Sequence, residues 1–291
     1  MSSARPGTLF PEGEALNESD YQRLADFIEQ RSGIKLPASK RVLLEGRLRK
    51  RLRQLHLDSF GAYCRFLFEN GNADDEEVEI LDAVTTNKTD FFRENHHFTF
   101  LSEIALPELV KRGGGVRRPL RLWSAGCSNG AEPYSLAMVC QDFAGRQAGF
   151  QFRVLGTDIS SSMLRMAQRA IYPHAMIDSV PLEWRKRYLL RCQDSGQDEV
   201  RIAPELRQLV SYAYVNLIWE AYPIEYQVEV LFCRNVLIYF DKPTQRAVLS
   251  RLCRHLVDGG YLILGHSETI TGLSLPLQAV APTVFVRERS I

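Results

Sequence analysis

A glycine-rich turn between an apolar segment and a helical segment is the most constraining feature of this chain. Residues 120–125 are mostly apolar, Gly126-Cys-Ser-Asn-Gly130 follows, and Glu132-Pro133 begins a segment with helical character. Glycines let a turn adopt positive φ and bring its backbone close to a ligand, and proline suits the first turn of a helix. We therefore predict a strand–loop–helix unit whose loop binds a nucleotide-like ligand.

The sequence of the loop narrows the choice of ligand. It lacks the Gly-Lys-Ser/Thr ending of a phosphate-binding loop, and it is not the Gly-x-Gly-x-x-Gly fingerprint of dinucleotide sites. A cofactor that contains an adenosine but no phosphate fits this loop better. We therefore expect S-adenosylmethionine, with S-adenosylhomocysteine as the product.

Composition excludes several classes of protein. Hydrophobic residues make up 45% of the chain and charged residues 24%, as in ordinary globular proteins. The net charge of +1 gives no overall attraction to nucleic acid, and no apolar run approaches the ~20 residues that span a bilayer. The six cysteines are scattered without zinc spacing, and adjacent His96 and His97 should diverge on a helix. We expect a cytoplasmic protein with no metal site, no nucleic-acid partner and no membrane insertion.

The N-terminal part of the chain has helical periodicity. Residues 1–16 are aperiodic and predict a flexible tail. A capping box at Ser19-Asp-Tyr-Gln22 predicts the start of a helix that ends at Gly33. Further helices are expected at about 38–55, 59–69 and 74–84. Residues 17–84 should therefore form an all-helical domain.

The remainder, 85–291, alternates helices with short apolar strands. A helix is expected near 96–111, and strands near 120–125, 152–158, 210–216, 229–233, 260–265 and 283–288. This order predicts an α/β fold, a Rossmann-like and mostly parallel sheet. The last connection is too short for a crossover helix, so the final strand should be antiparallel. Residues 188–203 predict a β-hairpin around the polar turn 193–198, within a small inserted β subdomain at about 186–205.

Polar residues follow the strand ends, where open parallel sheets bind ligands. Asp158 ends the second strand and can accept hydrogen bonds from ribose hydroxyls. Asn216 and Leu217 end the third, where an amide can read an adenine edge and Leu217 can pack on the ring. Arg234 and Asn235 follow the fourth strand. Such groups at several strand ends, in this order, predict a cofactor site rather than isolated helix caps.

A second polar cluster precedes the sheet at 85–94. Read alone, it is equally typical of an interdomain linker with two core phenylalanines. Asn87, Thr89 and Arg93 are nevertheless spaced so that they can reach one side of a cleft at the strand ends.

Four motifs together resemble the CheR family of S-adenosylmethionine-dependent methyltransferases, which methylate glutamates on bacterial chemoreceptors. They are Asn87-Lys-Thr-Asp-Phe-Phe-Arg-Glu, Trp123-Ser-Ala-Gly-Cys-Ser-Asn-Gly-Ala-Glu-Pro-Tyr-Ser, Gly156-Thr-Asp-Ile and Phe232-Cys-Arg-Asn-Val-Leu-Ile-Tyr-Phe. The resemblance covers about residues 17–289, and Ala131 departs from it where an acidic residue is common. It implies that the cofactor is contacted by Asn87, Thr89, Arg93, Gly126, Glu132, Asp158, Asn216, Leu217, Arg234 and Asn235. It also implies that Arg93 and Tyr239 lie nearest the transferred methyl group.

Methyl transfer to a carboxylate explains why no catalytic base is evident. The nucleophile is already ionised at neutral pH, so the enzyme must chiefly align the reacting atoms and exclude water. Arg93 and Tyr239 would then orient the reactants. Two alternatives stay open: a methyltransferase of this fold that acts on RNA or a small molecule, and a signalling module that binds the cofactor without turnover.

Two surfaces are candidates for receptor docking. The helix at 38–55 carries seven Lys or Arg residues against Glu45 alone, which favours an acidic partner over a plain surface or nucleic acid. We expect the cytoplasmic signalling domain of a chemoreceptor to dock there, on Arg47, Arg49, Lys50, Arg51 and Arg53. The hairpin exposes an edge suited to β-augmentation, and the resemblance leaves open whether a receptor C-terminal pentapeptide binds it.

Overall fold

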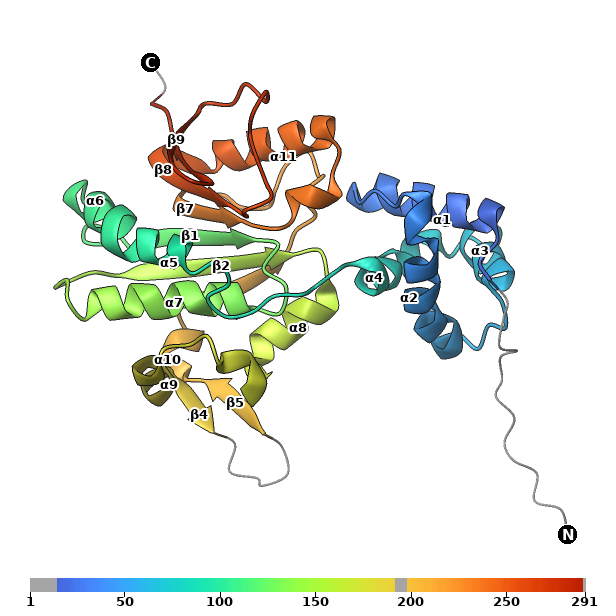
Figure 1. Ribbon diagram of the computed structural model, residues 1–291, viewed down its shortest axis with the longest axis horizontal. Coiled ribbons are helices and arrows are strands. Elements are labelled where there is room, and N and C mark those ends of the chain that lie inside the picture. Colours follow the sequence, from blue (N-terminus) through green and yellow to red (C-terminus); the bar gives the residue numbers. More distant parts are fainter. Residues whose placement is uncertain (1–14, 192–197, 290–291) are drawn as a thin grey trace, which may run out of the picture. The chain divides into compact units, whose positions relative to one another are not determined.

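The computed structural model describes residues 15–191 and 198–289, and the chain divides into two compact units, 1–86 and 87–291 (Figure 1). The first unit is helical. Its elements are α1 (Glu18–Ser32), the short 3-10 helix η1 (Ala38–Lys40), α2 (Arg41–Gln54), α3 (Phe60–Phe68) and α4 (Ala73–Val84). Leucines at 24, 44, 48 and 67 are fully buried and form its core. The apolar stripes predicted from the sequence therefore face one another.

The beginning of α1 differs from the prediction. Asn17, rather than Ser19, is the N-cap, and its side chain accepts a hydrogen bond from the backbone N–H of Asp20. Asn17 can reach this otherwise unpaired donor because it precedes the helix, whereas Ser19 already lies within it. Residues 1–14 of the expected tail lie outside the described residues, but Leu16 is buried and its N–H donates to Glu45. Gly33 ends the helix in the left-handed region, as predicted.

An ion pair joins α2 to α4. The Arg51 guanidinium makes two hydrogen bonds of 2.6 Å to the carboxylate of Glu76, which is 4% exposed. The Tyr63 hydroxyl donates to the same carboxylate at 3.0 Å. Arg51 is therefore held within its own unit, although the sequence placed it among the docking cations.

The second unit is built on a sheet with the strand order β6-β2-β1-β7-β8-β10-β9. The strands are β1 (Leu120–Ala125), β2 (Phe152–Asp158), β6 (Val210–Tyr214), β7 (Val228–Cys233), β8 (Leu256–Leu264), β9 (Leu277–Ala281) and β10 (Val284–Arg287). All pairings from β6 to β8 are parallel, and β10 is antiparallel to both β8 and β9. The Rossmann-like, mostly parallel sheet is confirmed. Strand β9 was missed because its residues are mostly exposed and do not alternate between apolar and polar.

Helices cover both faces of this sheet (Figure 1). One face packs on a continuous stretch made of α5 (His96–Phe100), a π-helical turn (Leu101–Ala105) and α6 (Leu106–Lys111), and on α7 (Ala131–Ala144). The core there includes Phe98, Leu106, Leu122 and Phe232. Helix α8 (Ser161–Arg169) lies beside α7, since the Tyr134 hydroxyl donates to the carbonyl of Ala167. Helix α11 (Lys242–Arg254) covers the other face.

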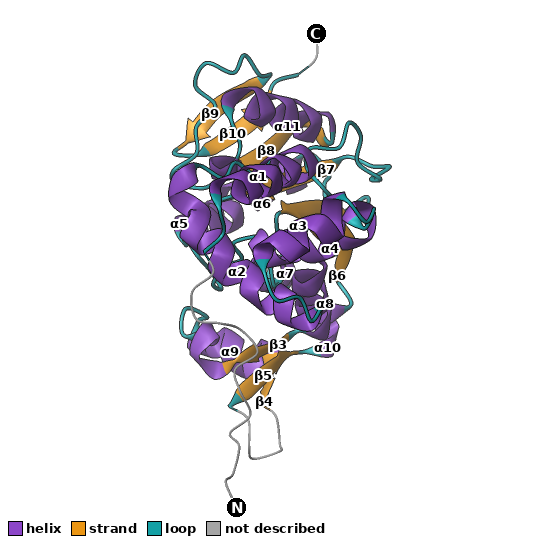
Figure 2. Cartoon of the chain, turned by 90° about the vertical axis from the view of Figure 1, so that its right-hand side faces the viewer, coloured by secondary structure: helices purple, strands orange, loops and turns teal. Residues whose placement is uncertain are grey.

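A small three-stranded sheet is inserted between β2 and β6. Its order is β3-β5-β4, from β3 (Ile171–Pro173), β4 (Leu189–Arg191) and β5 (Glu199–Ile202). Figure 2 shows it grouped with α9 (Leu182–Tyr188) and α10 (Pro204–Arg207), and η3 (His174–Ile177) follows β3. The predicted hairpin is β4 and β5, paired antiparallel, while most of its turn lies outside the described residues. Strand β3 is too short to have been recognised in the sequence.

The order of strands fixes where a ligand can bind. Strand β1 connects through α7 to β2 on one side, whereas β7 lies on its other side. The direction of winding therefore reverses between β1 and β7, and the carboxyl ends of the strands flank a crevice at such a switch point. The predicted ligand residues follow the ends of β1, β2, β6 and β7.

Candidate active site

The loop after β1 adopts the strained backbone that its glycines predict. Gly126 has φ 79°, Ser128 φ 51° and Gly130 φ 88°. A Cβ on Gly126 would lie 2.3 Å from a methyl carbon of Val236, so this position needs glycine for packing as well as for its φ angle. The loop after β1 therefore lies directly against the segment that follows β7.

Asp158 is fixed at the end of β2 as a hydrogen-bond acceptor. One of its carboxylate oxygens accepts the N–H of Ser128 at 2.7 Å, and the other accepts the N–H of Ser160 at 2.8 Å. The side chain is 7% exposed. A carboxylate offers about four acceptor positions, which suits it to the two hydroxyls of a ribose.

The segment after β6 adds an amide and an apolar side chain. Strand β6 pairs with β2, and the N–H of Val215 donates to the carbonyl of Asp158 at 3.1 Å. Asn216 is 2% exposed and its Oδ1 accepts the N–H of Ile218 at 3.2 Å. Leu217 is also buried. The segment that carries Asn216 and Leu217 therefore begins beside Asp158.

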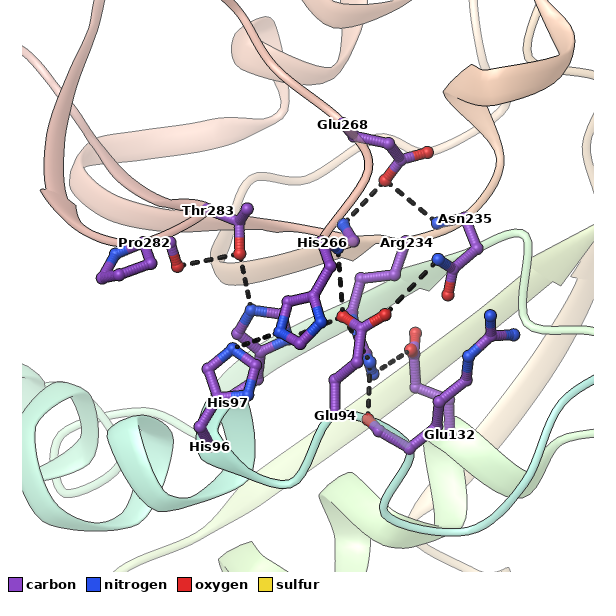
Figure 3. A network of polar contacts seen from close by, with 12 residues as sticks. Glu94, His96, His97, Glu132, Arg234, Asn235, His266, Glu268, Pro282 and Thr283 are labelled. Atoms are coloured by element: carbon purple, nitrogen blue, oxygen red, sulfur yellow. Dashed lines mark hydrogen bonds and ion pairs between the residues drawn. The ribbon is translucent and has the colours of Figure 1, made fainter.

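Arg234 is the centre of a buried ionic network at the end of β7 (Figure 3). Its guanidinium lies 3.0 Å from the carboxylate of Glu132 and 3.1 Å from that of Glu94, and its side chain is 2% exposed. It also donates to the carbonyl of Arg93 at 2.5 Å. Arg234 therefore joins three segments that are far apart in the sequence: the one at 85–94, the start of α7 and the end of β7.

The two carboxylates of this network have different environments. Burial raises the pKa of Glu132, while the charge of Arg234 and hydrogen bonds from Ser124 and Arg234 lower it in part. Burial also opposes ionisation of Glu94, but Arg234 dominates with other donors and brings the pKa of Glu94 below its usual value. A single arginine therefore offsets the effect of burial on two carboxylates beside the ligand loops, in part for Glu132 and more than fully for Glu94.

Glu94 is the residue of this network that sequence analysis did not single out. It follows Arg93 in the same motif, which was the available signal. Phe92 and Glu94 both have positive φ, 52° and 56°, and such strain in residues other than glycine accumulates at functional sites. The strain directs the Glu94 carboxylate to Arg234 and leaves the Arg93 carbonyl facing the same guanidinium.

The other predicted residues belong to the segment at 85–94 and to the segment after β7. The carbonyl of Asn87 accepts the Ser128 hydroxyl at 2.8 Å, which ties the segment at 85–94 to the loop after β1. The Arg93 guanidinium donates to the carbonyl of Lys88 at 3.0 Å and is partly exposed, and Thr89 is half-buried. Tyr239 is half-buried in the 3-10 helix η4 (Leu237–Tyr239).

The histidines beside this network do not diverge as expected. The ring centroids of His96 and His97 lie 4.0 Å apart, and His266 stacks on His96, with its centroid 4.6 Å from that of His96. His97 Nε2 lies 2.8 Å from the Thr283 hydroxyl, which itself donates to the carbonyl of Pro282. Within residues 15–191 and 198–289, no group of three or more His, Cys, Asp or Glu side chains could hold a metal ion.

His97 makes a testable contribution to the pH dependence of folding. Its side chain is fully buried, and this burial lowers the pKa of His97 from 6.5 to about 3. Between these values the unfolded chain binds a proton at His97 that the folded chain excludes, so stability falls as pH falls. The free energy of unfolding should fall between pH 7.5 and pH 5.5, and this fall should be about 1.4 kcal/mol smaller in a His97→Gln variant than in the parent. Urea unfolding at both pH values measures this difference, and equal losses would contradict the assignment.

The side chains at the strand ends fit S-adenosylmethionine. The set consists of a carboxylate, an amide beside an apolar side chain, and a charged network, which are the kinds of group that can bind a ribose, an adenine and an amino acid. This sheet and this set of groups define an S-adenosylmethionine-dependent methyltransferase. Residues 87–286 match the CheR methyltransferase SAM binding domain, and residues 19–85 match the CheR methyltransferase all-alpha domain. The chain belongs to the CheR methyltransferase family.

Curated relatives match this chain over nearly its whole length. Chemotaxis protein methyltransferase 2 of Pseudomonas aeruginosa is 35% identical over 286 residues, which cover 98% of this chain and 99% of the relative. The chemotaxis protein methyltransferases of Salmonella typhimurium and Escherichia coli are 36% and 35% identical over 271 residues, covering 93% of this chain and 91% of each relative. The similarity therefore includes the helical unit as well as the sheet.

Proposed function

We propose that this chain transfers a methyl group from S-adenosylmethionine to glutamate side chains of bacterial chemoreceptors. It would act as a protein-glutamate O-methyltransferase in the cytoplasm. The structural observation that supports this most strongly is that Arg234 joins three segments proposed to bind the cofactor. The relatives that match nearly the whole chain are named chemotaxis protein methyltransferases. No helix among the described residues is long and apolar enough to cross a membrane.

Each segment has a role in binding the cofactor under this proposal. Asp158 accepts the ribose hydroxyls, and Asn216 and Leu217 bind the adenine. The loop after β1, with Gly126, passes under the cofactor, and the Glu132–Arg234 pair faces its charged amino-acid end. Asn87, Thr89 and Asn235 contact the cofactor on its remaining sides. The contacts described above hold Asp158 and the loop after β1, and they tie the segment at 85–94 to that loop.

The chemistry requires alignment more than acid–base catalysis. The bound cofactor supplies an electrophilic methyl group, and the receptor glutamate is ionised at neutral pH. Arg93 and Tyr239 hold the carboxylate in line with the methyl group and exclude water from it. Neither can bind the carboxylate too strongly, because an interaction equally strong in the ground state does not raise the rate.

Transfer of labelled methyl to a chemoreceptor cytoplasmic fragment tests the proposal. Glutamate methyl esters release methanol in alkali, so we expect volatile label that is lost in Arg93→Ala and falls roughly 10-fold or more in Tyr239→Phe. Arg146→Ala, which removes an exposed arginine just after α7, is the matched control and should keep full activity. If the fragment takes up no label while calorimetry shows cofactor binding, the substrate is another molecule or the chain is a non-catalytic module.

We also propose that part of α2 docks the receptor. Of the five predicted cations, Arg51 is paired with Glu76, and Arg47 donates to the carbonyl of Val84 and to Thr86. Arg49 lies over the Phe60 ring. Lys50 and Arg53 are exposed, and Val42 nearby is 75% exposed. The charges most accessible to an acidic receptor helix are therefore Lys50 and Arg53, and Arg47 and Arg51 mainly stabilise the helical unit.

Reversing these two charges should weaken receptor recognition without affecting the cofactor. We expect Lys50→Glu/Arg53→Glu to lower kcat/KM for the receptor roughly 10-fold at low salt, and the difference to shrink at high salt. The Kd for S-adenosylhomocysteine should not change. Lys111→Glu, which reverses one charge at the end of α6, outside the helical unit, is the control. An unchanged kcat/KM in the double variant would exclude α2 as the docking surface.

Peptide tethering is a separate proposal for the small sheet. Strand β4 lies at its edge and Leu190 is 49% exposed, which suits addition of an extended peptide. Receptor fragments with and without a C-terminal pentapeptide, compared in the same assay, test it. A lower KM for the longer fragment supports tethering, and equal values oppose it.

A further inference from the structure

Glu268 is a buried carboxylate that no step of the proposed chemistry uses. It follows β8 and is 6% exposed. One of its oxygens accepts the backbone N–H groups of Asn235 and Gly265, at 3.0 and 2.7 Å. The other accepts those of Val236 and Leu237, at 2.9 and 2.8 Å. A single side chain thus satisfies four backbone donors, three of which belong to the segment after β7.

These donors point together because of the local backbone. Asn235 has φ 59°, in the left-handed region, and successive N–H groups around such a residue form a concave anion-binding nest. Val236 is the N-cap of η4 and Leu237 is its first residue, where N–H groups have no partner within the helix. Burial raises the pKa of Glu268, and its four N–H donors lower it in part. Only the ionised carboxylate can accept all four bonds.

The same residues connect the carboxylate to Tyr239. The carbonyl of Val236 accepts the N–H of Tyr239 at 3.2 Å, and the carbonyl of Leu237 accepts that of Phe240 at 3.1 Å. The bonds to Glu268 therefore fix the peptide groups on which η4 is built. Asn235, at the other end of the segment, also donates its side-chain amide to Glu94 at 3.4 Å (Figure 3).

We infer that Glu268 is a positioning residue, which sets the conformation of segment 234–239 and thereby places Asn235 against the cofactor and Tyr239 beside the transferred methyl group. The inference rests on the roles proposed above for these two residues. Glu268 itself touches neither reactant in this assignment. It acts by holding two neighbouring strand ends, those of β7 and β8, in one arrangement.

Replacement of the carboxylate by an amide tests this directly. In Glu268→Gln one oxygen remains, but the new NH2 group donates, so two of the four backbone N–H groups face a donor. Segment 234–239 should therefore shift, so that Asn235 no longer binds the cofactor and Tyr239 no longer lies beside the methyl group. We expect the Kd for S-adenosylhomocysteine to rise roughly 10-fold and kcat to fall roughly 10- to 100-fold, with the KM for the receptor unchanged.

Glu229→Gln is the matched control. Glu229 is also a buried glutamate, 3% exposed, at the opposite end of β7. It accepts the N–H of Arg121 at 2.8 Å and pairs with Arg118 at 2.6 Å. Its amide variant should lower the melting temperature without changing Kd or kcat. An equal rise in Kd in both variants would mean general loosening of the sheet and would overturn the inference.

Gly265→Ala perturbs segment 234–239 without changing Glu268. It therefore tests the positioning role even if Glu268→Gln does not fold. A Cβ at Gly265 would lie 2.6 Å from the Asn235 side-chain nitrogen and 3.0 Å from Glu268, so it should displace Asn235. We expect the same rise in Kd. If the folded variants stay within roughly 2-fold of the parent in Kd and kcat, the positioning role is wrong. Because Kd needs no receptor, this holds whether or not receptor glutamates are the substrate.

Discussion

An Arg234→Met variant should lose about 3–5 kcal/mol of unfolding free energy, the cost of removing one partner from a buried charge network. Arg234 is 2% exposed and lies about 3 Å from both Glu94 and Glu132. Methionine has a similar length, so packing changes little while two buried carboxylates lose their counter-ion. For a domain of this size the melting temperature should fall by roughly 6–20 °C. Scanning calorimetry measures the change.

The loss should depend on pH in a defined direction. Without Arg234, the pKa of Glu94 rises from its lowered value, and the pKa of Glu132, already raised by burial, rises further. A carboxyl whose pKa is higher in the folded than in the unfolded chain destabilises the fold as pH rises through that interval. The difference in unfolding free energy between the parent and Arg234→Met should therefore be largest near pH 8 and become smaller toward pH 5.

A surface arginine provides the comparison. Arg146 pairs with Asp142 at 3.0 Å and is 62% exposed, and such pairs contribute about 0–1 kcal/mol. Arg146→Met should therefore melt close to the parent at every pH. If Arg234→Met were no less stable than Arg146→Met, Arg234 would not be the centre of the network.

The strands of this fold were predictable where they are central, and were missed where they are exposed. Buried strands β1 and β2 have the bounds read from their apolar runs, because both faces of a central parallel strand require apolar residues. Strand β9 lies at the edge of the sheet and is mostly exposed. Nothing in its sequence therefore distinguishes it from a loop, and only its pairing with β10 defines it.

The sequence motifs indicated the proposed cofactor contacts, but not the residues that support them. Glu94 meets Arg234 across 139 intervening positions, and Glu268 reaches Asn235 across 32. Local sequence carries no information about such pairs, since any buried carboxylate can satisfy either an arginine or a set of backbone donors. The proposed docking cations show that residues of one type on one helix can also have different partners. Arg51 and Arg53 look equivalent on the helix, yet only Arg51 meets a buried glutamate of α4.

Asp158→Ala should abolish most of the cofactor affinity. The carboxylate is fixed by the backbone of Ser128 and Ser160, and under our proposal it accepts both ribose hydroxyls. Hydrogen bonds to charged groups contribute about 1.5–3 kcal/mol each. Loss of two such bonds should therefore raise the Kd for S-adenosylhomocysteine roughly 100-fold or more, which calorimetry can measure.

Loss of the carboxylate also releases the two backbone donors, so the loop after β1 should become less ordered in Asp158→Ala even without ligand. Hydrogen exchange at Ser128 should accelerate, whereas exchange in the middle of β2 should not. Asp142→Ala removes a carboxylate from the far end of α7 and should leave both Kd and exchange unchanged. If Asp158→Ala bound S-adenosylhomocysteine as tightly as Asp142→Ala, the cofactor would not lie at the end of β2. The proposed site would then have to be placed elsewhere on the sheet.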